Sequence, residues 1–283
     1  MRIKLIVINK RMLRFATLFV VFATLVGLGL GYLNKIKVFT TSSYSSNDGS
    51  DGFVHFFTEG KLAIIIDDFG SGREGVKEMM FIDRHLTFAV MPFLPYSQSD
   101  AKAAHEKGYE IIVHLPMEPN NGQPSWLGPR PILGGMSYET TKQIVRDAFD
   151  NVPYAVGANN HMGSKASSQE VIMSAVLDVI KEKRFYFVDS RTADHPIGKK
   201  VADSKGVICY NRDVFLDGQQ PKSYVKKKLK EAADIALKNG YAVVIGHVGV
   251  EGGKVTADAI KEMLPEFDKR NVRLVFVSEL NMV

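Results

Sequence analysis

Short apolar runs alternate with helical patterns over most of this chain, and that alternation constrains the fold more than any other feature. Eight such runs occupy residues 62–66, 86–90, 110–114, 154–158, 185–189, 206–210, 241–247 and 272–277. They are nearly continuous in apolar residues, as expected for strands of a parallel sheet that is covered on both faces. The alternation therefore predicts an α/β fold, a distorted (β/α)7–8 barrel built from residues 61–283.

The beginning of the chain has a different character. Residues 15–33 contain no charged side chain, and five basic residues precede them. A helix of this length spans about 28 Å, close to the thickness of the membrane hydrocarbon, and the basic residues favour a cytoplasmic location for residues 1–14. We therefore predict a cytoplasmic basic segment over 1–14, a transmembrane signal-anchor over 15–33, a flexible linker over 34–60 and an extracytoplasmic domain over 61–283.

A cleaved signal peptide is the competing interpretation of this segment, and cleavage would leave a secreted domain. Lys35-Ile36-Lys37 follows the apolar run where a signal peptide has small residues at its cleavage site, which favours the uncleaved anchor. The anchor would make the membrane a partner of the chain and the protein a single-pass membrane protein.

The charge distribution excludes one class of partner. The formal net charge is +5, but residues 1–37 carry seven basic residues and no acidic residue, so the remainder has 29 basic and 31 acidic residues. A domain with that balance lacks the basic surface that nucleic-acid binding requires, and we expect no nucleic-acid partner. The single cysteine, Cys209, lies in a predicted buried strand and is expected to be an inert apolar residue.

Polar side chains stand at or just beyond the carboxyl ends of five predicted strands. They are Asp67, Asp68, His114, Glu118, His161, Asp189, Arg191 and His247. In a barrel these strand ends share one rim, where ligands bind. Buried carboxylates and imidazoles are costly unless they pair or bind a cation, and one Asp with two His suits zinc or a related divalent ion. Taken singly, each of these residues is equally consistent with a structural role.

Seven segments in this order resemble the divergent polysaccharide deacetylase family, a distant branch of the NodB-type deacetylases of carbohydrate esterase family 4. The segments are 64–70 (IIIDDFG), 86–97 (LTFAVMPFLPYS), 108–119 (GYEIIVHLPMEP), 159–167 (NNHMGSKAS), 185–192 (FYFVDSRT), 211–217 (NRDVFLD) and 242–248 (AVVIGHV). The resemblance covers nearly all of residues 61–283. It implies a NodB-like distorted barrel and a metal-dependent hydrolase of N-acetyl or other acyl groups on an extracytoplasmic polysaccharide.

The resemblance also implies roles for individual residues. Asp67 and Asp68 match the family's paired aspartates, the first as catalytic base and the second as metal ligand. His114 matches a metal-binding histidine, but Glu118 stands where the family has its second histidine. His161 is expected to supply that missing imidazole, with Glu118 as the possible substitute ligand.

Two further matches complete the implied catalytic set. His247 matches the family's general acid. Asp189 matches a carboxylate that orients the catalytic groups, with Arg191 as its partner. The expected cofactor is a divalent metal ion, and zinc is the first choice.

Several alternatives remain open at this point. The departure at Glu118 favours, as the main alternative, a non-catalytic carbohydrate-binding protein that retains the barrel. A barrel hydrolase that acts on phosphate esters is a third hypothesis. The stretch 119–135 is a candidate binding loop because it is too long for an ordinary connection. Phe93, Tyr96 and Trp126 could stack on sugar rings or serve as ordinary loop packing.

Overall fold

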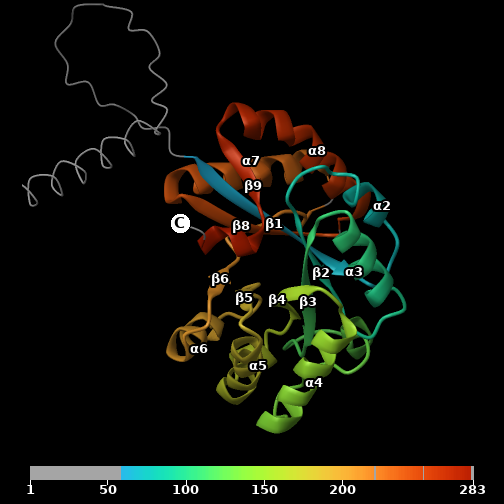
Figure 1. Ribbon diagram of the computed structural model, residues 1–283, viewed down its shortest axis with the longest axis vertical. Helices are drawn as coiled ribbons and strands as arrows, with labels where there is room; N and C mark the ends of the chain where they lie inside the picture. The colour runs from blue at the N-terminus through green and yellow to red at the C-terminus, as the bar shows by residue number, and fades with distance from the viewer. Residues whose placement is uncertain (1–58, 220, 251, 282–283) are drawn as a thin grey trace, which may run out of the picture. The chain divides into compact units, whose positions relative to one another are not determined.

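A computed structural model describes residues 59–281, apart from residues 220 and 251 (Figure 1). The predicted cytoplasmic segment and transmembrane anchor, and nearly all of the predicted linker, lie outside the described residues. In the part of the chain that is described, no helix is both long and apolar enough to cross a membrane. The described residues all belong to one compact unit, His55–Val283.

A single parallel sheet forms the centre of this unit. Its strands are β1 (Gly60–Phe69), β2 (Thr87–Val90), β3 (Glu110–Met117), β4 (Ala155–Met162), β5 (Tyr186–Asp189), β6 (Cys209–Asn211), β7 (Val214–Phe215), β8 (Tyr241–His247) and β9 (Val272–Val275). All of their pairings are parallel. The eight strands predicted from apolar runs are therefore confirmed, and the sequence analysis missed only β7.

The sheet is curled but open, which corrects the prediction of a barrel. Its order is β6-β5-β4-β3-β2-β1-β8-β7, and no ladder among the described residues joins β6 to β7. Only Arg212 and Asp213 separate these two strands, whereas parallel neighbours need a crossover of a dozen or more residues. The chain therefore passes from one sheet edge to the other there, and the sheet remains a half-barrel.

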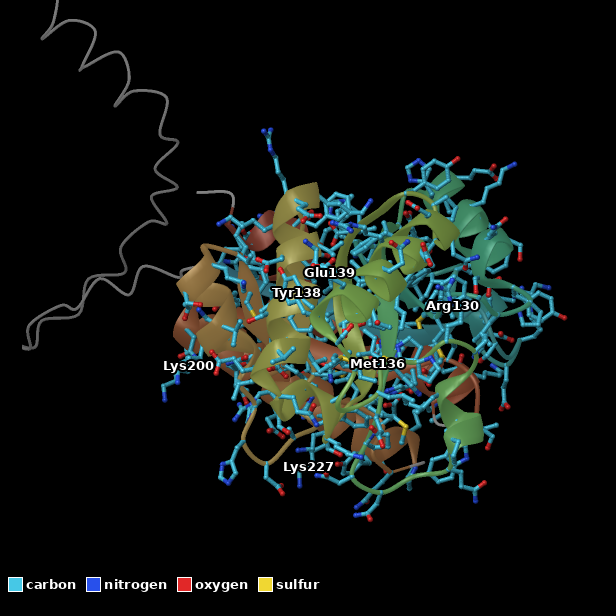
Figure 2. The ribbon with its side chains drawn as sticks, turned by 90° about the horizontal axis from the view of Figure 1, so that it is seen from below. Arg130, Met136, Tyr138, Glu139, Lys200 and Lys227 are labelled. Atoms are coloured by element: carbon cyan, nitrogen blue, oxygen red, sulfur yellow. The ribbon has the colours of Figure 1, made fainter. Side chains whose placement is uncertain are left out.

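The helices cover the convex side of this half-barrel. They are α2 (Val76–Met79), α3 (Ser97–Glu106), α4 (Tyr138–Asn151), α5 (Glu170–Lys183), α6 (Gly198–Lys205), α7 (Lys222–Asn239) and α8 (Gly253–Lys269), with 3-10 turns η1 (Pro124–Leu127), η2 (Ala166–Ser168) and η3 (Val277–Asn281). Ser137 begins α4 by accepting a hydrogen bond from the Thr140 N–H, a favourable cap. Tyr138 and Glu139 mark the start of α4, Lys200 lies on α6 and Lys227 on α7 (Figure 2).

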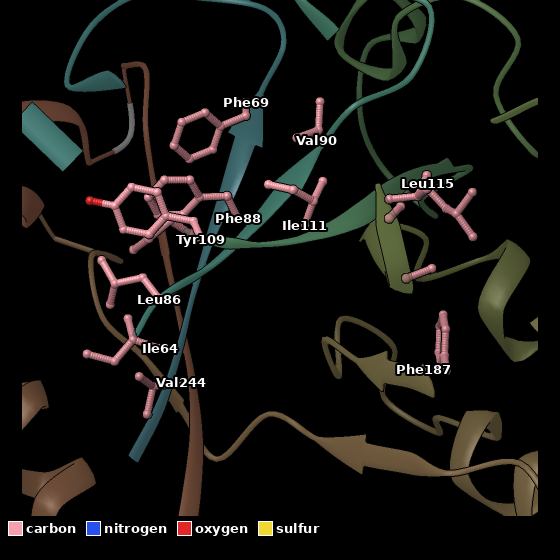
Figure 3. Packing of buried hydrophobic residues seen from close by; sticks show 14 of the residues in the cluster. Ile64, Phe69, Leu86, Phe88, Val90, Tyr109, Ile111, Leu115, Phe187 and Val244 are labelled. Atoms are coloured by element: carbon pink, nitrogen blue, oxygen red, sulfur yellow. The ribbon is translucent and has the colours of Figure 1, made fainter. Parts of the chain in front are cut away.

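The two faces of the sheet belong to two separate apolar cores. Ile64, Phe69 and Phe88 belong to the core between the sheet and its helices (Figure 3). Ala63 and Ile65 belong to a second core, inside the curl. Because successive side chains of a strand point to opposite faces, β1, β2, β3, β5 and β8 each contribute to both cores, and this explains why their apolar runs are continuous.

Candidate active site

The alternation of side chains along the strands brings polar groups together at the carboxyl edge inside the curl. Ile65 faces the inner core, so Asp67, two residues later, follows on the same face. Ile245 likewise places His247 there, and Asp67 is the register partner of His247 in the ladder between β1 and β8. Both side chains are buried, with 2% and 6% of their surface exposed.

Asp68 reaches the same place through an irregularity. The register between β1 and β2 shifts after Ile66, and Asp68 has a positive φ of 70°. This conformation is uncommon outside glycine and is often found at functional sites. Here it brings one oxygen, Oδ1, to 3.4 Å from Nε2 of His114 and 3.3 Å from Nδ1 of His161.

Asp68, His114 and His161 form the cluster of possible metal ligands that the described residues contain, with ligand atoms all within 4.8 Å of one another. Nδ1 of His114 lies 2.7 Å from Oδ1 of Asn159, and Nε2 of His161 lies 3.1 Å from the carbonyl oxygen of Trp126. Both of these oxygens accept hydrogen bonds, so those two ring nitrogens carry the proton. The other two nitrogens then present their lone pairs to Asp68.

The carboxylate of Asp68 lacks the hydrogen bonds that a buried oxygen needs. Its Oδ1 is buried, and none of the described residues donates a hydrogen bond to it. An acceptor left in this state is costly, and three lone pairs that converge repel one another unless a cation lies between them. The residues present therefore fit a divalent metal, and their oxygen and imidazole donors suit zinc.

The electrostatics of the cluster agree with this assignment. Burial alone would raise the pKa of Asp68, but the imidazoles of His114 and His161 outweigh burial and lower the pKa well below its ordinary value. Burial would lower the pKa of His114, but the carboxylates of Asp67 and Asp68 raise it. Without a metal, a proton on His114 balances the carboxylates, so metal ions and protons should compete for this site.

Asp67 is held by a residue that the sequence analysis did not single out. The amide nitrogen of Asn159 donates to Oδ1 of Asp67 over 2.8 Å, while the amide oxygen of the same residue accepts from His114. The second oxygen of Asp67, Oδ2, lies 3.5 Å from Nε2 of His114 and faces the cluster. Burial raises the pKa of Asp67, and the neighbouring imidazoles of His114 and His247 limit that rise.

His247 depends on a second missed residue, Asp217. Asp217 accepts from Nδ1 of His247 over 2.8 Å, from the backbone N–H of His247 over 2.7 Å and from Oγ1 of Thr256 over 2.8 Å. Burial would lower the pKa of His247, but Asp217 raises it to about 10. The sequence contained a reason to single out Asp217, because this residue ends the segment 211–217 that carried part of the family resemblance.

Asp189 and Arg191 lie apart from this group. Tyr186 and Val188 face the inner core, so Asp189 points to the helix side of the sheet. It accepts from the backbone N–H of Arg191 over 2.8 Å, and its Oδ2 lies against Gly198 at the start of α6. Burial raises the pKa of Asp189, and the hydrogen bond from the backbone N–H of Arg191 partly offsets this rise. The side chain of Arg191 is exposed.

The side chain of Glu118 holds the loop 119–135 in place through hydrogen bonds. It accepts hydrogen bonds from the N–H of Gly134 over 2.6 Å and from Nζ of Lys165 over 2.8 Å. Its backbone N–H donates to the carbonyl oxygen of Ile132, so the end of the loop returns to the end of β3. The structure thus brings His161, and not Glu118, to Asp68 and His114.

Two hollows meet at the cluster and share Asp68, His161 and Met162 in their walls. The first, the polar hollow, measures about 280 Å³, and besides Asp67, His114 and His247 its walls include the polar Asn121, Asn160, Ser164, Ser190 and Thr192 and the apolar Pro119, Phe215 and Ile245. The second, the apolar hollow, measures about 780 Å³, and its walls include Met91, Leu94, Trp126, Val248 and Val250. A substrate can therefore reach the cluster from two sides of different chemistry.

The three candidate sugar-stacking residues have different positions. Trp126 lines the apolar hollow with 54% of its surface exposed. The guanidinium of Arg73 covers the ring of Tyr96 at 4.7 Å, and that of Arg130 covers the ring of Phe93 at 4.8 Å. Of these three aromatic residues, therefore, only Trp126 lines one of the two hollows.

Comparisons with known proteins agree with this description. The family model described as "divergent polysaccharide deacetylase" matches residues 64–281. The chain is 38% identical to the Escherichia coli (strain K12) protein YibQ, itself described as uncharacterised, over 188 residues that make up 66% of this chain and 58% of that protein. The match thus spans less than two thirds of the length of that relative.

Two further relatives extend the comparison. An uncharacterised Haemophilus influenzae protein is 32% identical over 210 residues, which are 74% of this chain and 71% of that protein. The crystal structure of an uncharacterised protein from Agrobacterium tumefaciens C58 is similar with a TM-score of 0.72 at 20% identity. That similarity covers 82% of this chain and 92% of the other, and it shows a shared fold.

Proposed function

We propose that this chain, which belongs to the divergent polysaccharide deacetylase family, is a metal-dependent hydrolase that removes N-acetyl or other acyl groups from amino sugars of an extracytoplasmic polysaccharide. One observation carries the proposal. The ligand cluster of Asp68, His114 and His161 lines the same small hollow as a buried carboxylate, Asp67, and a buried imidazole, His247. Metal ligands, a base and an acid around one hollow are the set that amide hydrolysis requires.

Asp68, His114 and His161 would hold the ion. A divalent metal, zinc by the ligand set, would supply the Lewis acidity that acidifies water and polarises the acyl carbonyl. Asn159 and the carbonyl of Trp126 fix the two imidazoles from behind, so their lone pairs need no reorientation when the ion binds.

Asp67 is the proposed general base. Asn159 holds its Oδ1, which leaves Oδ2 facing the cluster, at 3.5 Å from His114. The raised pKa of Asp67 makes this carboxylate a stronger proton acceptor than an exposed aspartate. It takes the proton that the attacking water loses.

His247 is the proposed general acid. With a pKa of about 10 it stays protonated at neutral pH. Asp217 engages Nδ1, and the proposal assigns the proton on Nε2 to the leaving amine. In the overall step the C–N bond breaks, a C–O bond forms to the water oxygen, and a carboxylic acid and a free amine are produced.

Membrane attachment through residues 15–33 is part of the proposal and rests on the sequence. Fractionation of cells that express the full chain is expected to place it in the membrane fraction. Deletion of residues 1–33 is expected to release it. Release of the full chain without this deletion would favour a cleaved signal peptide and a secreted domain.

The activity is tested with the full chain in mild detergent. Incubation with N-acetylated chitin oligosaccharides or peptidoglycan and zinc should release acetate and free amine in equal amounts, and a chelator should abolish the release. His247→Ala should lose the activity, whereas His105→Ala, which changes an exposed histidine of α3, should keep it. Glycan binding without acetate release, repeated over several divalent ions, would favour the non-catalytic carbohydrate-binding protein instead.

A further inference from the structure

The two hollows beside the ligand cluster differ in size and in part of their walls. The polar hollow presents amides and hydroxyls, among them Asn160 and Thr192, which hydrogen-bond each other over 3.1 Å, beside the apolar Phe215 and Ile245. The apolar hollow presents methionine, leucine, valine and tryptophan side chains beside the polar Ser71, Arg73, Glu74 and Ser125, and it is more than twice as large. A substrate with one polar and one apolar part can use both sets of walls.

The apolar hollow is a built feature of the fold. Gly128 in its wall has a φ of 66°, a conformation that favours glycine, and a β-carbon there would be in ordinary contact with the side chains of Leu94, at 3.4 Å, and Met91, at 3.8 Å. Trp126 is fixed beside it because its carbonyl oxygen accepts from the ligand His161. The wall of the hollow is thus tied directly to a proposed metal ligand.

Apolar side chains around this hollow remain in contact with water. Val250 is 86% exposed and Trp126 is 54% exposed. Exposed apolar groups that gather beside a buried polar site indicate a ligand surface. The wall also contains two charged residues near its rim: Arg73, which is bound to Asp100 and stacked on Tyr96, and the exposed Glu74.

These features favour one of two possible occupants. A second sugar in the apolar hollow would place part of its surface against Met91, Leu94 and Val248, where its hydroxyl groups would lose hydrogen bonds to water and only polar side chains elsewhere in the wall, such as Ser71, Glu74 and Ser125, could replace them. An acetyl group would fill only a small part of about 780 Å³. An aliphatic chain suits both the volume and the chemistry of the walls.

We infer that the substrate carries an aliphatic acyl chain longer than acetyl, which lies in the apolar hollow while the amino sugar lies in the polar hollow. The inference rests on the proposed function, because it takes the acyl carbonyl to lie where the hollows meet. The products are then a fatty acid and a free amino sugar. Water is the only co-reactant, since the amide C–N bond is exchanged for a C–O bond without oxidation or reduction.

The chain supplies its own probe for this inference. It contains one tryptophan, Trp126, and that residue lines the apolar hollow. The full chain is titrated with N-acetyl-, N-butyryl- and N-hexanoyl-glucosamine while tryptophan emission is recorded, with and without zinc. The emission should shift to shorter wavelength on binding, and affinity should rise up to about fourfold for each added methylene group.

A matched pair of variants locates the effect. Leu94→Asn places an amide in the wall of the hollow and should remove most of the gain between acetyl and hexanoyl. Val171→Asn makes the same kind of change at a valine of α5 that is 55% exposed and should keep the gain. Equal affinity for all three ligands, or an equal gain in both variants, would overturn the inference.

Free amine is measured in the same samples so that the two proposals can fail separately. Amine released from the acetyl compound, together with affinities that do not depend on chain length, would leave the hydrolase proposal standing and overturn the inference. Affinities that rise with chain length without release of amine would support the acyl-binding hollow and contradict the hydrolase proposal.

Discussion

Two carboxylates with histidine partners, the buried Asp217 and the half-buried Asp68, lie at the same mouth of the curled sheet, and their hydrogen bonds are satisfied to different degrees. Asp217 accepts three hydrogen bonds, two from His247 and one from Thr256. Oδ1 of Asp68 faces two imidazoles, yet within the described residues it has no hydrogen-bond donor. Neighbouring residues stabilise the carboxylate of Asp217, whereas Oδ1 of Asp68 is left to be stabilised by a bound cation.

The difference shows which of the two groups is structural support and which is a ligand. Burying a carboxylate costs free energy, and a protein offsets that cost with donors or with a cation. Around Asp217 the donors are all supplied by the chain. Around Asp68 the nearest nitrogens present lone pairs, because Asn159 and Trp126 engage their opposite ring nitrogens.

Replacement of Asp68 should have the largest effect on activity. Asp68→Asn removes one metal ligand and should lower kcat/KM by about 10³-fold or more, because several kcal/mol of transition-state stabilisation depend on the ion. Rates of acetate release measured at several substrate concentrations test this, and an unchanged kcat/KM would contradict the comparison.

Replacement of Asp67 tests whether the base can be separated from the ligands. Asp67→Asn should keep the bound metal and lower kcat by roughly 10²- to 10⁴-fold, the range expected for loss of a general base. Elemental analysis and rate measurements on the same sample decide the matter. If the variant loses its metal as well, the roles of Asp67 and Asp68 would have to be exchanged.

Replacement of Asp217 should break the satisfied pair. The raised pKa of His247 means that its stabilising effect is fully present below the ordinary value of about 6.5 and is lost as pH rises through about 10. Asp217→Asn should cost about 1–3 kcal/mol in the free energy of unfolding at pH 7 and flatten this loss at high pH.

The same variant should change the pH dependence of the reaction. If His247 donates its proton, the alkaline limb of the kcat/KM profile lies near pH 10 in the wild type and moves toward neutrality in Asp217→Asn. Thr256→Val, which removes one donor to Asp217 but leaves the pair intact, is the control. An unmoved alkaline limb would show that another group is the acid.

Loss of the residue that orients His114 should have a smaller effect on zinc binding. Asn159→Leu removes the acceptor for Nδ1 of His114 and should weaken zinc binding by about 10- to 100-fold. Competition with a chromophoric chelator measures the affinity. Unchanged affinity would mean that the tautomer of His114 is set by other means.

The sequence predicted the parts of this arrangement that depend on strand order and strand ends. Strands in a parallel sheet end at one edge, so Asp67, Asp68, His114 and His247 could be placed together without coordinates. The predicted distorted barrel is found as a curled half-barrel, because the chain between β6 and β7 is too short for a crossover, and the two-residue strand β7 was not predicted.

The sequence could not predict the positions of Asp189, Asp217 and Asn159, because it does not show in which direction a side chain points. The run that contains Tyr186 and Val188 is apolar on both faces, so its pattern does not show to which face Asp189 points. The coordinates place Asp189 on the helix side, whereas Asp217 accepts the proton of His247 inside the curl. Asn159 was missed for a related reason, since its role comes from two residues distant in sequence, Asp67 and His114.

The metal site is tested by the number of zinc ions bound per chain after reconstitution and dialysis, measured by elemental analysis. We expect one ion in the wild type and in Asp217→Asn, and a large loss in Asp68→Asn, His114→Ala and His161→Ala. Undiminished zinc in all three of these ligand variants would contradict the assignment of Asp68, His114 and His161 as a metal site.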